Sequence, residues 1–169
     1  MTKVLYPGSF DPITKGHMNI IDEASSLFRE VVVAVLNNSS KKNNMFTIPE
    51  RVEMIKNLYK EIPNVKVISG NKAAIDVAID NDCKAIIRGL RGISDYDYEL
   101  QLSEINKDIS NGKIKTICLF ADSKYQFISS SVVKEVFFLG KDISKYVPLD
   151  VEEKMKEKNN KVGEWNDKK

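Results

Sequence analysis

The chain has 169 residues, of which 42% are hydrophobic and 30% are charged, so it is large enough for one globular domain with a buried core. Its 26 basic and 24 acidic side chains nearly cancel, whereas proteins that coat nucleic acid carry a marked basic excess. No apolar run approaches the roughly 20 residues of a membrane span, and the N-terminus lacks the pattern of a secretory signal. We expect a cytoplasmic protein that binds neither nucleic acid nor membranes.

The two cysteines, Cys83 and Cys118, do not have the spacing of a metal site, and each lies next to or within an apolar run. We expect both to be buried free thiols. Buried free thiols are typical of a reducing compartment, which again indicates the cytoplasm.

Five short runs of mostly branched apolar residues predict buried strands. The runs are continuous rather than alternating in polarity, which is typical of a parallel sheet covered on both faces. They cover residues 4–6, 31–36, 65–69, 85–87 and 116–120.

Segments with the apolar spacing of amphipathic helices separate these strands. Thr47, with Glu50 three residues later, predicts a capping box, and Gly140 is a typical stop signal after a helix. In the fourth helix, the apolar residues between 98 and 105 would form the face that packs on the sheet. The expected helices lie within residues 20–28, 52–59, 74–79, 98–105 and 130–139, with a short terminal helix at 148–158.

This alternation predicts an α/β fold, a five-stranded parallel sheet with right-handed crossovers and helices on both faces. One domain would cover residues 1–158, and residues 159–169 would form a charged tail. The sequence leaves open whether this tail is disordered or whether Trp165 docks on a neighbouring surface.

Glycines, hydroxyls and cations follow four of the five predicted strands. They occur in residues 7–17, 37–42, 88–92 and 121–131. Because ligands bind at the carboxyl ends of the strands in a sheet of this kind, these segments would meet around one site. The loops at the opposite edge show no such concentration, so the asymmetry itself indicates a binding edge.

The residue types at this edge suit a polyphosphate, since helix N-termini point free amides and partial positive charge at anions. Arg88 and Arg91 can each hold two phosphate oxygens, although alone they could also be a solvated turn. Lys41 or Lys42 would add a point charge, unless their loop is plain surface. The chain contains no G-x-x-x-x-G-K-[ST] stretch, and no dinucleotide glycine pattern follows the first strand.

His17, the single histidine of the chain, falls in the first turn of the first predicted helix, where the cations converge. A lone histidine in a helix is more often a cap or a packing residue. This position favours a functional role, because a helix N-terminus disfavours the imidazolium and keeps the ring a neutral donor. Such a donor can stabilise the charge that builds on a phosphoryl oxygen.

Three motifs resemble those of a known superfamily. Residues 6–17, YPGSFDPITKGH, resemble the opening motif of the nucleotidyltransferases with the signature [HT]-x-G-H. With residues 88–91, RGLR, and 128–135, ISSSVVKE, the threonine form of this motif looks like the bacterial phosphopantetheine adenylyltransferase family. The similarity runs in order from residue 3 to residue 150, and three motifs in order are far more specific than one.

The resemblance implies a Rossmann-like dinucleotide-binding fold and the penultimate step of coenzyme A synthesis. ATP and 4'-phosphopantetheine would give dephospho-coenzyme A and pyrophosphate, with Mg²⁺ as the cofactor. The resemblance assigns no protein ligand to the metal, which phosphates and water can hold. It also implies a homohexamer and feedback inhibition by coenzyme A.

The roles of single residues follow from the resemblance, position by position. His17 would stabilise the transition state, and Lys41 and Arg91 would be further catalytic residues. The phosphopantetheine site would consist of Ser9, Lys41, Ala74 and Arg88. The ATP site would consist of Ser9, Phe10, His17, Gly89, Leu90, Arg91, Glu99, Tyr125, Gln126, Phe127, Ile128, Ser129, Ser130 and Ser131.

Some of these assignments stay open. The loop of residues 37–44 is one residue longer than in some relatives, so either Lys41 or Lys42 could be the phosphate contact. Lys134 stands where the wider superfamily often has arginine, and its role is undetermined. Glu99 is indicated by the resemblance alone, since by itself it could be an exposed helix residue.

Other functions are alternatives to this one. Nicotinate mononucleotide adenylyltransferases and cytidylyltransferases usually have histidine where this chain has Thr14. A module that binds ATP without turnover would not need to keep His17, Arg88 and Arg91 together. An aminoacyl-tRNA synthetase shares related motifs, but this chain is too short for its additional domains.

Overall fold

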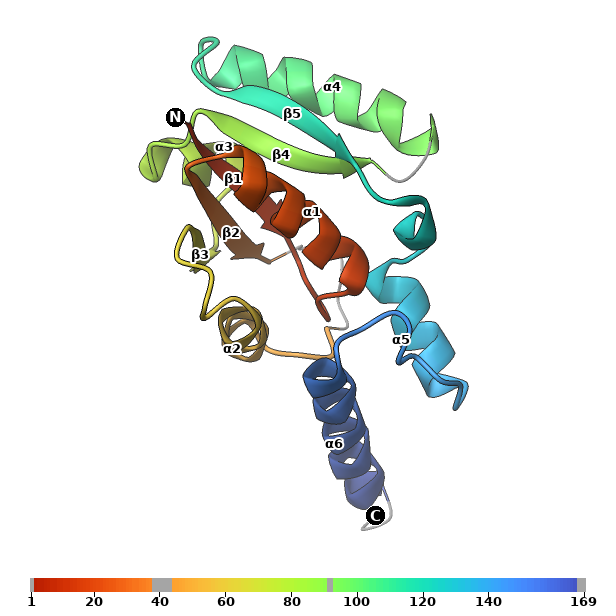
Figure 1. Cartoon of the computed structure of the whole chain (residues 1–169). Coiled ribbons are helices and arrows are strands. Elements are labelled where there is room, and N and C mark those ends of the chain that lie inside the picture. The colour runs from red at the N-terminus through yellow and green to blue at the C-terminus, as the bar shows by residue number, and fades with distance from the viewer. Residues whose placement is uncertain (1, 38–43, 91–92, 167–169) are drawn as a thin grey trace.

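The computed structural model describes residues 2–37, 44–90 and 93–166 (Figure 1). Within these residues, one sheet of five parallel strands has the order β3-β2-β1-β4-β5, which confirms the predicted fold class. The strands are β1 (Lys3–Gly8), β2 (Glu30–Leu36), β3 (Val65–Gly70), β4 (Ala85–Leu90) and β5 (Lys115–Phe120).

The sheet grows in both directions from β1. The chain first adds β2 and β3 on one side, through α1 (Lys15–Leu27) and α2 (Ile48–Leu58). It then returns to add β4 and β5 on the other side, through α3 (Ala74–Asp80) and α4 (Ile93–Ile109). Because such crossovers are right-handed, the reversal places α1 and α2 on one face and α3 and α4 on the other. The carboxyl ends of β1 and β4 lie at this switch point, where ligands bind in such sheets.

Alternate residues of the central strand β1 enter separate cores on the two faces of the sheet. Val4 belongs to the same core as Ile21 of α1 and Ile55 of α2. Leu5 belongs to the second core, with Ile75 of α3. The strand is therefore apolar on both faces, as its continuous apolar run predicts.

Two predicted helix boundaries are confirmed. Thr47 caps α2, since its Oγ1 accepts the Glu50 N–H at 3.4 Å and Glu50 Oε2 accepts the Thr47 N–H at 2.6 Å. Helix α5 (Ser130–Phe138) ends shortly before Gly140, which has a φ of +70°. This is the left-handed conformation that favours glycine after a helix.

The edge of the molecule formed by β5 and α4 is less buried than predicted. Tyr98, Leu100 and Ile105 of α4 are 61%, 47% and 53% exposed, so the expected inner face of this helix is wrong. Cys83 is buried but Cys118 is exposed, which corrects the expectation for the second thiol. The physical reason is the place of β5, because an edge strand has a neighbour on one side only.

The last helix, α6 (Leu149–Asn166), runs past residue 158, where the sequence predicted its end. Val151 and Met155 in its first half are buried in the core beside α1 and α2. Figure 1 shows that the remainder extends away from the sheet. The side chain of Trp165 and residues 167–169 lie outside the described part of the chain. None of the helices described is both long and apolar enough to cross a bilayer.

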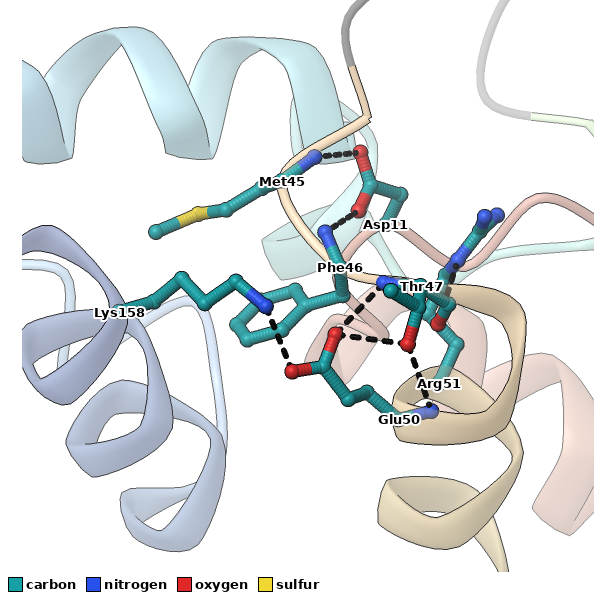
Figure 2. Close-up of polar contacts among 7 residues, drawn as sticks. All are labelled: Asp11, Met45, Phe46, Thr47, Glu50, Arg51 and Lys158. Carbon is teal, nitrogen blue, oxygen red and sulfur yellow. Dashed lines mark hydrogen bonds and ion pairs between the residues drawn. The ribbon is translucent and has the colours of Figure 1, made fainter. Parts of the chain in front are cut away.

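An ion pair ties α6 to the start of α2 (Figure 2). Lys158 Nζ lies 2.6 Å from Glu50 Oε1, while Glu50 Oε2 accepts the hydroxyl of Thr47 at 2.8 Å. Burial alone would raise the pKa of Glu50, but the hydrogen bonds from Lys158 and Thr47 outweigh it. They lower the pKa from 4.5 to about 2. The capping carboxylate therefore stays charged in the folded protein at acidic pH.

We expect Glu50 to stabilise the protein well into the acidic range. A carboxyl whose pKa is lower in the folded state stabilises it fully above the unfolded pKa, and this contribution is lost as the pH falls through the folded pKa. Glu50→Gln should therefore reduce the loss of unfolding free energy between about pH 5 and about pH 3, measured by urea titration. The effect should be modest, because the side chain is 38% exposed and solvent screens it.

Glu61→Gln is the matched control, since the Glu61 side chain is 84% exposed and caps no helix. Its pH dependence should equal that of the wild type. If the unfolding free energy of Glu50→Gln also had the pH dependence of the wild type, the assigned role of the ion pair would be contradicted.

Candidate active site

A cavity of about 570 Å³ opens at the carboxyl ends of β1 and β4. Its lining comes from these strand ends, from the first turn of α1, from α4, and from the segment that joins β5 to α5. The predicted site residues that line it are Ser9, Phe10, His17, Arg88, Gly89, Glu99, Tyr125, Ile128, Ser129, Ser130 and Ser131. Three of the four segments that the strand-end argument named therefore meet around one space, and α4 adds a fourth piece that the argument did not name. Residues 38–42 of the remaining segment lie outside the described part of the chain.

The other predicted site residues do not line this cavity in the described part of the chain. Leu90 is 5% exposed and buried at the end of β4. Phe127 is 88% exposed and Gln126 is exposed beside it. Ala74 packs against the second core at the start of α3. Lys41, Lys42 and Arg91 lie outside the described residues.

Seven lining residues were not among the predicted site residues, namely Tyr6, Pro7, Gly8, Gly16, Ile20, Tyr98 and Ala121. Four of them, Pro7, Gly8, Gly16 and Ala121, fall within the segments 7–17 and 121–131 that the sequence placed at the binding edge. Tyr98 lies one residue before Glu99 on α4 and was expected in the core. Nothing in the sequence distinguishes it from a core residue, because only the position of α4 aims it at the cavity.

His17 is held at the start of α1 by Thr14, the residue that caps this helix. The Thr14 N–H donates to His17 Nδ1 at 3.1 Å, and Thr14 Oγ1 accepts the His17 N–H at 3.3 Å. This is a capping box in which the imidazole takes the place that glutamate or glutamine usually holds. The interaction fixes the ring over the first turn of α1.

The same hydrogen bond favours one position for the proton of the ring. An N–H donates to a ring nitrogen that carries no hydrogen, so this contact favours the neutral ring with hydrogen on Nε2, and Thr14 Oγ1 also lies 3.0 Å from Nδ1. A second proton on Nδ1 would face the Thr14 N–H directly. The geometry thus favours a neutral imidazole that acts as a donor through Nε2 beside the cavity.

The ring of Phe10 packs against the ring of His17. Its side chain is 1% exposed, and its ring centroid lies 5.1 Å from that of His17 in an edge arrangement. A Cβ on Gly8 would come within 2.8 Å of the Phe10 ring, so only glycine fits at that position. Because the side chain of Phe10 is buried, any contact of this residue with a ligand would come from its backbone.

Arg88 and Glu99, which were assigned to different ligands, bind each other. Arg88 Nε donates to Glu99 Oε2 at 2.6 Å, and Arg88 Nη2 donates to Glu99 Oε1 at 2.7 Å. Burial would lower the pKa of the Arg88 guanidinium, but the hydrogen bonds and charge of Glu99 raise it above its ordinary value. Glu99 is 8% exposed, so it is not the exposed helix residue that its sequence context alone suggests.

The serines at the start of α5 make different hydrogen bonds. Ser129 caps the helix, since its Oγ accepts the Val132 N–H at 3.2 Å. The Ser130 hydroxyl donates to the Pro12 carbonyl at 2.8 Å and so ties α5 to the first loop. Ser131 is exposed, and all three line the cavity. A short 3-10 helix (Ser123–Tyr125) brings Tyr125 to the same wall.

The loop between β1 and α1 carries a buried carboxylate, that of Asp11 (Figure 2). Asp11 is 1% exposed and accepts the N–H groups of Met45 at 3.0 Å and Phe46 at 2.8 Å. Lys134 Nζ of α5 lies 2.7 Å from Asp11 Oδ2. Nearby, the buried Arg51 donates to the Ser9 carbonyl at 2.9 Å. The loop that carries Ser9 is thus held from several directions.

The cavity does not offer a set of protein ligands for a metal. Among its described lining residues Glu99 is the one carboxylate, and both of its oxygens accept from Arg88. The described residues also contain no group of three His, Cys, Asp or Glu side chains that could hold an ion. A metal bound here would depend on oxygens of a ligand, as Mg²⁺ does on polyphosphates.

The chain was compared with known proteins. The model of the cytidylyltransferase-like family matches residues 5–136. The chain belongs to this family. It is 48% identical to the phosphopantetheine adenylyltransferase of Finegoldia magna, across 94% of this chain and 97% of the relative. It is also 45% identical to the phosphopantetheine adenylyltransferase of Staphylococcus carnosus, across 93% and 96%.

A solved structure supports the fold of this cytidylyltransferase-like protein. The putative nicotinate-nucleotide adenylyltransferase of Vibrio parahaemolyticus aligns with a TM-score of 0.62 over 92% of this chain and 99% of its own. Its sequence identity is only 19%, so the likeness concerns the fold and not the acceptor. The α/β architecture is therefore that of the family.

The proton position on His17 can be observed directly in this cytidylyltransferase-like protein, because the chain has one histidine. We expect long-range proton–nitrogen correlation spectra near neutral pH to show an unprotonated Nδ1 and a protonated Nε2. The urea-unfolded chain is the control, and its ring should show the averaged signals of a free imidazole. A protonated Nδ1 in the folded protein would contradict the capping geometry.

Proposed function

We propose that this enzyme transfers the adenylyl group of ATP to 4'-phosphopantetheine, with release of dephospho-coenzyme A and pyrophosphate. Relatives named for this activity are 44–48% identical over more than nine tenths of the chain. The observation that carries the proposal is the meeting of His17, Arg88 and the serine-capped α5 around one cavity. These are the donors that phosphoryl chemistry requires at one place.

The reaction we propose needs no general base. The phosphate of phosphopantetheine is already an anion near neutral pH, so its oxygen can attack the α-phosphorus of ATP in line, and pyrophosphate leaves. Catalysis then depends on positioning and on donors aimed at the charge that develops. His17 supports this role, since the Thr14 N–H on Nδ1 leaves hydrogen on Nε2 for a phosphoryl oxygen.

The remaining donors would hold the two substrates. The N-termini of α1 and α5 suit the polyphosphate of ATP, and Ser9 lies where it would reach both substrates. Glu99 holds Arg88 by its Nε and Nη2, so the acceptor phosphate would approach Nη1. Lys41 or Lys42 and Arg91 would add charge from the segments outside the described residues. Ala74 is proposed at the far end of the pantetheine arm.

Mg²⁺ enters this proposal as part of the substrate, MgATP. Glu99 is held by Arg88, so the phosphates and water would supply the ligands of the ion. Coenzyme A contains both the adenylyl group and the pantetheine arm, so it would compete for the same cavity and act as an inhibitor. We place the reaction in the cytoplasm.

The decisive experiment mixes the pure protein with ATP, Mg²⁺ and phosphopantetheine and detects dephospho-coenzyme A by mass. His17→Ala should lower turnover by about 10²- to 10³-fold, because one well-placed donor is lost from the transition state. The binding of either substrate should change much less. Leu27→Ala, at an exposed position on the far part of α1, is the control and should leave turnover unchanged.

Two outcomes would contradict this function. Product from nicotinate mononucleotide but not from phosphopantetheine would assign a different acceptor. Binding of ATP without any product, measured by calorimetry, would make the chain a nucleotide-binding module. Near-normal turnover of His17→Ala would refute the role of the ring while leaving the acceptor intact.

We also propose that the enzyme forms a homohexamer through its exposed apolar edge. Ile105 and Ile109 of α4 are 53% and 56% exposed, and Phe120 at the end of β5 is 76% exposed. Exposed large apolar side chains are typical of a surface that another chain covers.

Light scattering of the purified protein should give six times the chain mass of 19.2 kDa. Ile105→Glu should shift the mass towards smaller particles, because a charge would be buried at the contact. Leu27→Glu, which is 61% exposed on α1, should leave the mass unchanged. A monomeric wild type would refute the assembly without touching the proposed reaction.

A further inference from the structure

We propose that Asp11 and Lys134 are positioning residues for this site. In this inference Lys134 acts on the buried carboxylate of Asp11 and not on a phosphate of the nucleotide. Asp11 in turn joins the first loop and helix α5, which both line the cavity, to the segment that enters α2. The inference rests on the adenylyl transfer proposed above.

The contacts of Asp11 join parts of the chain that are far apart in sequence. Its Oδ1 accepts the Phe46 N–H at 2.8 Å, and its Oδ2 accepts the Met45 N–H at 3.0 Å. The same Oδ2 lies 2.7 Å from Nζ of Lys134, which is 123 residues away. One carboxylate therefore connects the first loop, the segment that enters α2, and helix α5.

The pair of Asp11 and Lys134 is largely buried, which indicates a role in fixing the segments that it joins. The side chains of Lys134 and Asp11 are 18% and 2% exposed. Removing charges from water is unfavourable, and good geometry is needed to offset this cost. Loss of one partner leaves the other charge buried without compensation. Such a pair contributes little net stability over apolar side chains, but it strongly favours one arrangement of the segments it joins.

That arrangement is the one the active site requires. Asp11 directly follows Phe10, whose ring packs against His17. Lys134 lies about one turn beyond the serine cap of α5. A shift of Asp11 would therefore move Phe10 and, through Lys134, the start of α5 that lines the cavity.

Two further bonds fix the same loop and support this reading. Ser130 donates to the Pro12 carbonyl at 2.8 Å, and Arg51 donates to the Ser9 carbonyl at 2.9 Å. Lys134 does not belong to the described residues that line the cavity. Its ammonium already lies against Asp11, so its role in this protein is internal.

A double-mutant cycle tests the pair through Asp11→Asn, Lys134→Met and the combined variant. Each single change should lower kcat by about 10²-fold, because small misplacements of reacting groups have effects of that size. The combined variant should be no slower than the slower single variant, since one shared interaction has been removed. The Kd of ATP, measured by calorimetry, should change by less than about threefold in all of them.

A Lys134 that binds phosphate would give another pattern. Lys134→Met would then weaken ATP binding strongly, Asp11→Asn would not, and the effects on kcat/KM would multiply in the combined variant. That pattern would overturn the proposal. So would normal kcat in both single variants.

The ring signals of His17 separate a positioning role from a simple loss of stability. The ring signals of His17 should shift in Asp11→Asn, because Phe10 supports this ring, and they should stay unchanged in Lys66→Met. Lys66 is the matched control: it is 60% exposed and forms an ion pair of 3.0 Å with Glu30 at the opposite edge of the sheet. Unchanged His17 signals in Asp11→Asn would overturn the proposal.

The cycle remains informative where a single variant is unstable. The combined variant holds neither charge, so its melting temperature should lie at or above that of the less stable single variant. A combined variant less stable than both would overturn the pairing. Because melting and ATP binding need no phosphopantetheine, a wild type that makes no product would refute the adenylyl transfer and still leave the pair testable.

Discussion

The hydrogen bond from the Thr14 N–H to His17 Nδ1 is the interaction on which the proposed chemistry depends. It serves the helix and the reaction together, because it satisfies a free amide at the start of α1 and sets the proton on Nε2. The chain builds the same cap twice. At α2 the third helical residue is Glu50, whose charge supports stability, while at α1 it is His17, whose ring faces the cavity.

This arrangement explains why the loop before α1 is held so firmly. A donor stabilises a transition state only when it is in place beforehand, since any reorganisation would be subtracted from its effect. Phe10 fills the space beneath the ring of His17, and Gly8 leaves room for it. Asp11 and the Ser9 carbonyl are bound from α2, α5 and the segment between β2 and α2. The precision of the site thus comes from elements that are distant in sequence.

The sequence predicted the features that depend on local physics. Continuous apolar runs indicated the strands, the residues at Thr47 and Gly140 indicated helix ends, and the positions after the strands indicated most of the cavity lining. The pairing of Arg88 with Glu99 was not predictable, because the two were read as separate ligand contacts and their approach depends on how α4 lies over β4. Asp11 was missed for the same reason, as a buried acid has no signal in the sequence.

Periodicity likewise indicates which side chains are apolar but not what covers them. The exposed residues of α4 and β5 were expected in the core, because the spacing of apolar residues is the same whether or not another element covers them. The length of α6 beyond residue 158 escaped prediction because its second half is charged and lacks an apolar stripe. For α4 the error lay in assuming a covering neighbour, whereas for α6 it lay in ending the helix where its apolar residues become sparse.

Two of the cations described at and near the site are paired with carboxylates. Arg88 and Lys134 each bind a carboxylate, so neither contributes an unbalanced field to the cavity. What the cavity offers to phosphates is instead a set of oriented donors, namely the ring of His17, the helix N-termini and one edge of a fixed guanidinium. Oriented donors distinguish an attacking, a transferred and a leaving phosphoryl group, whereas diffuse positive charge attracts all of them equally.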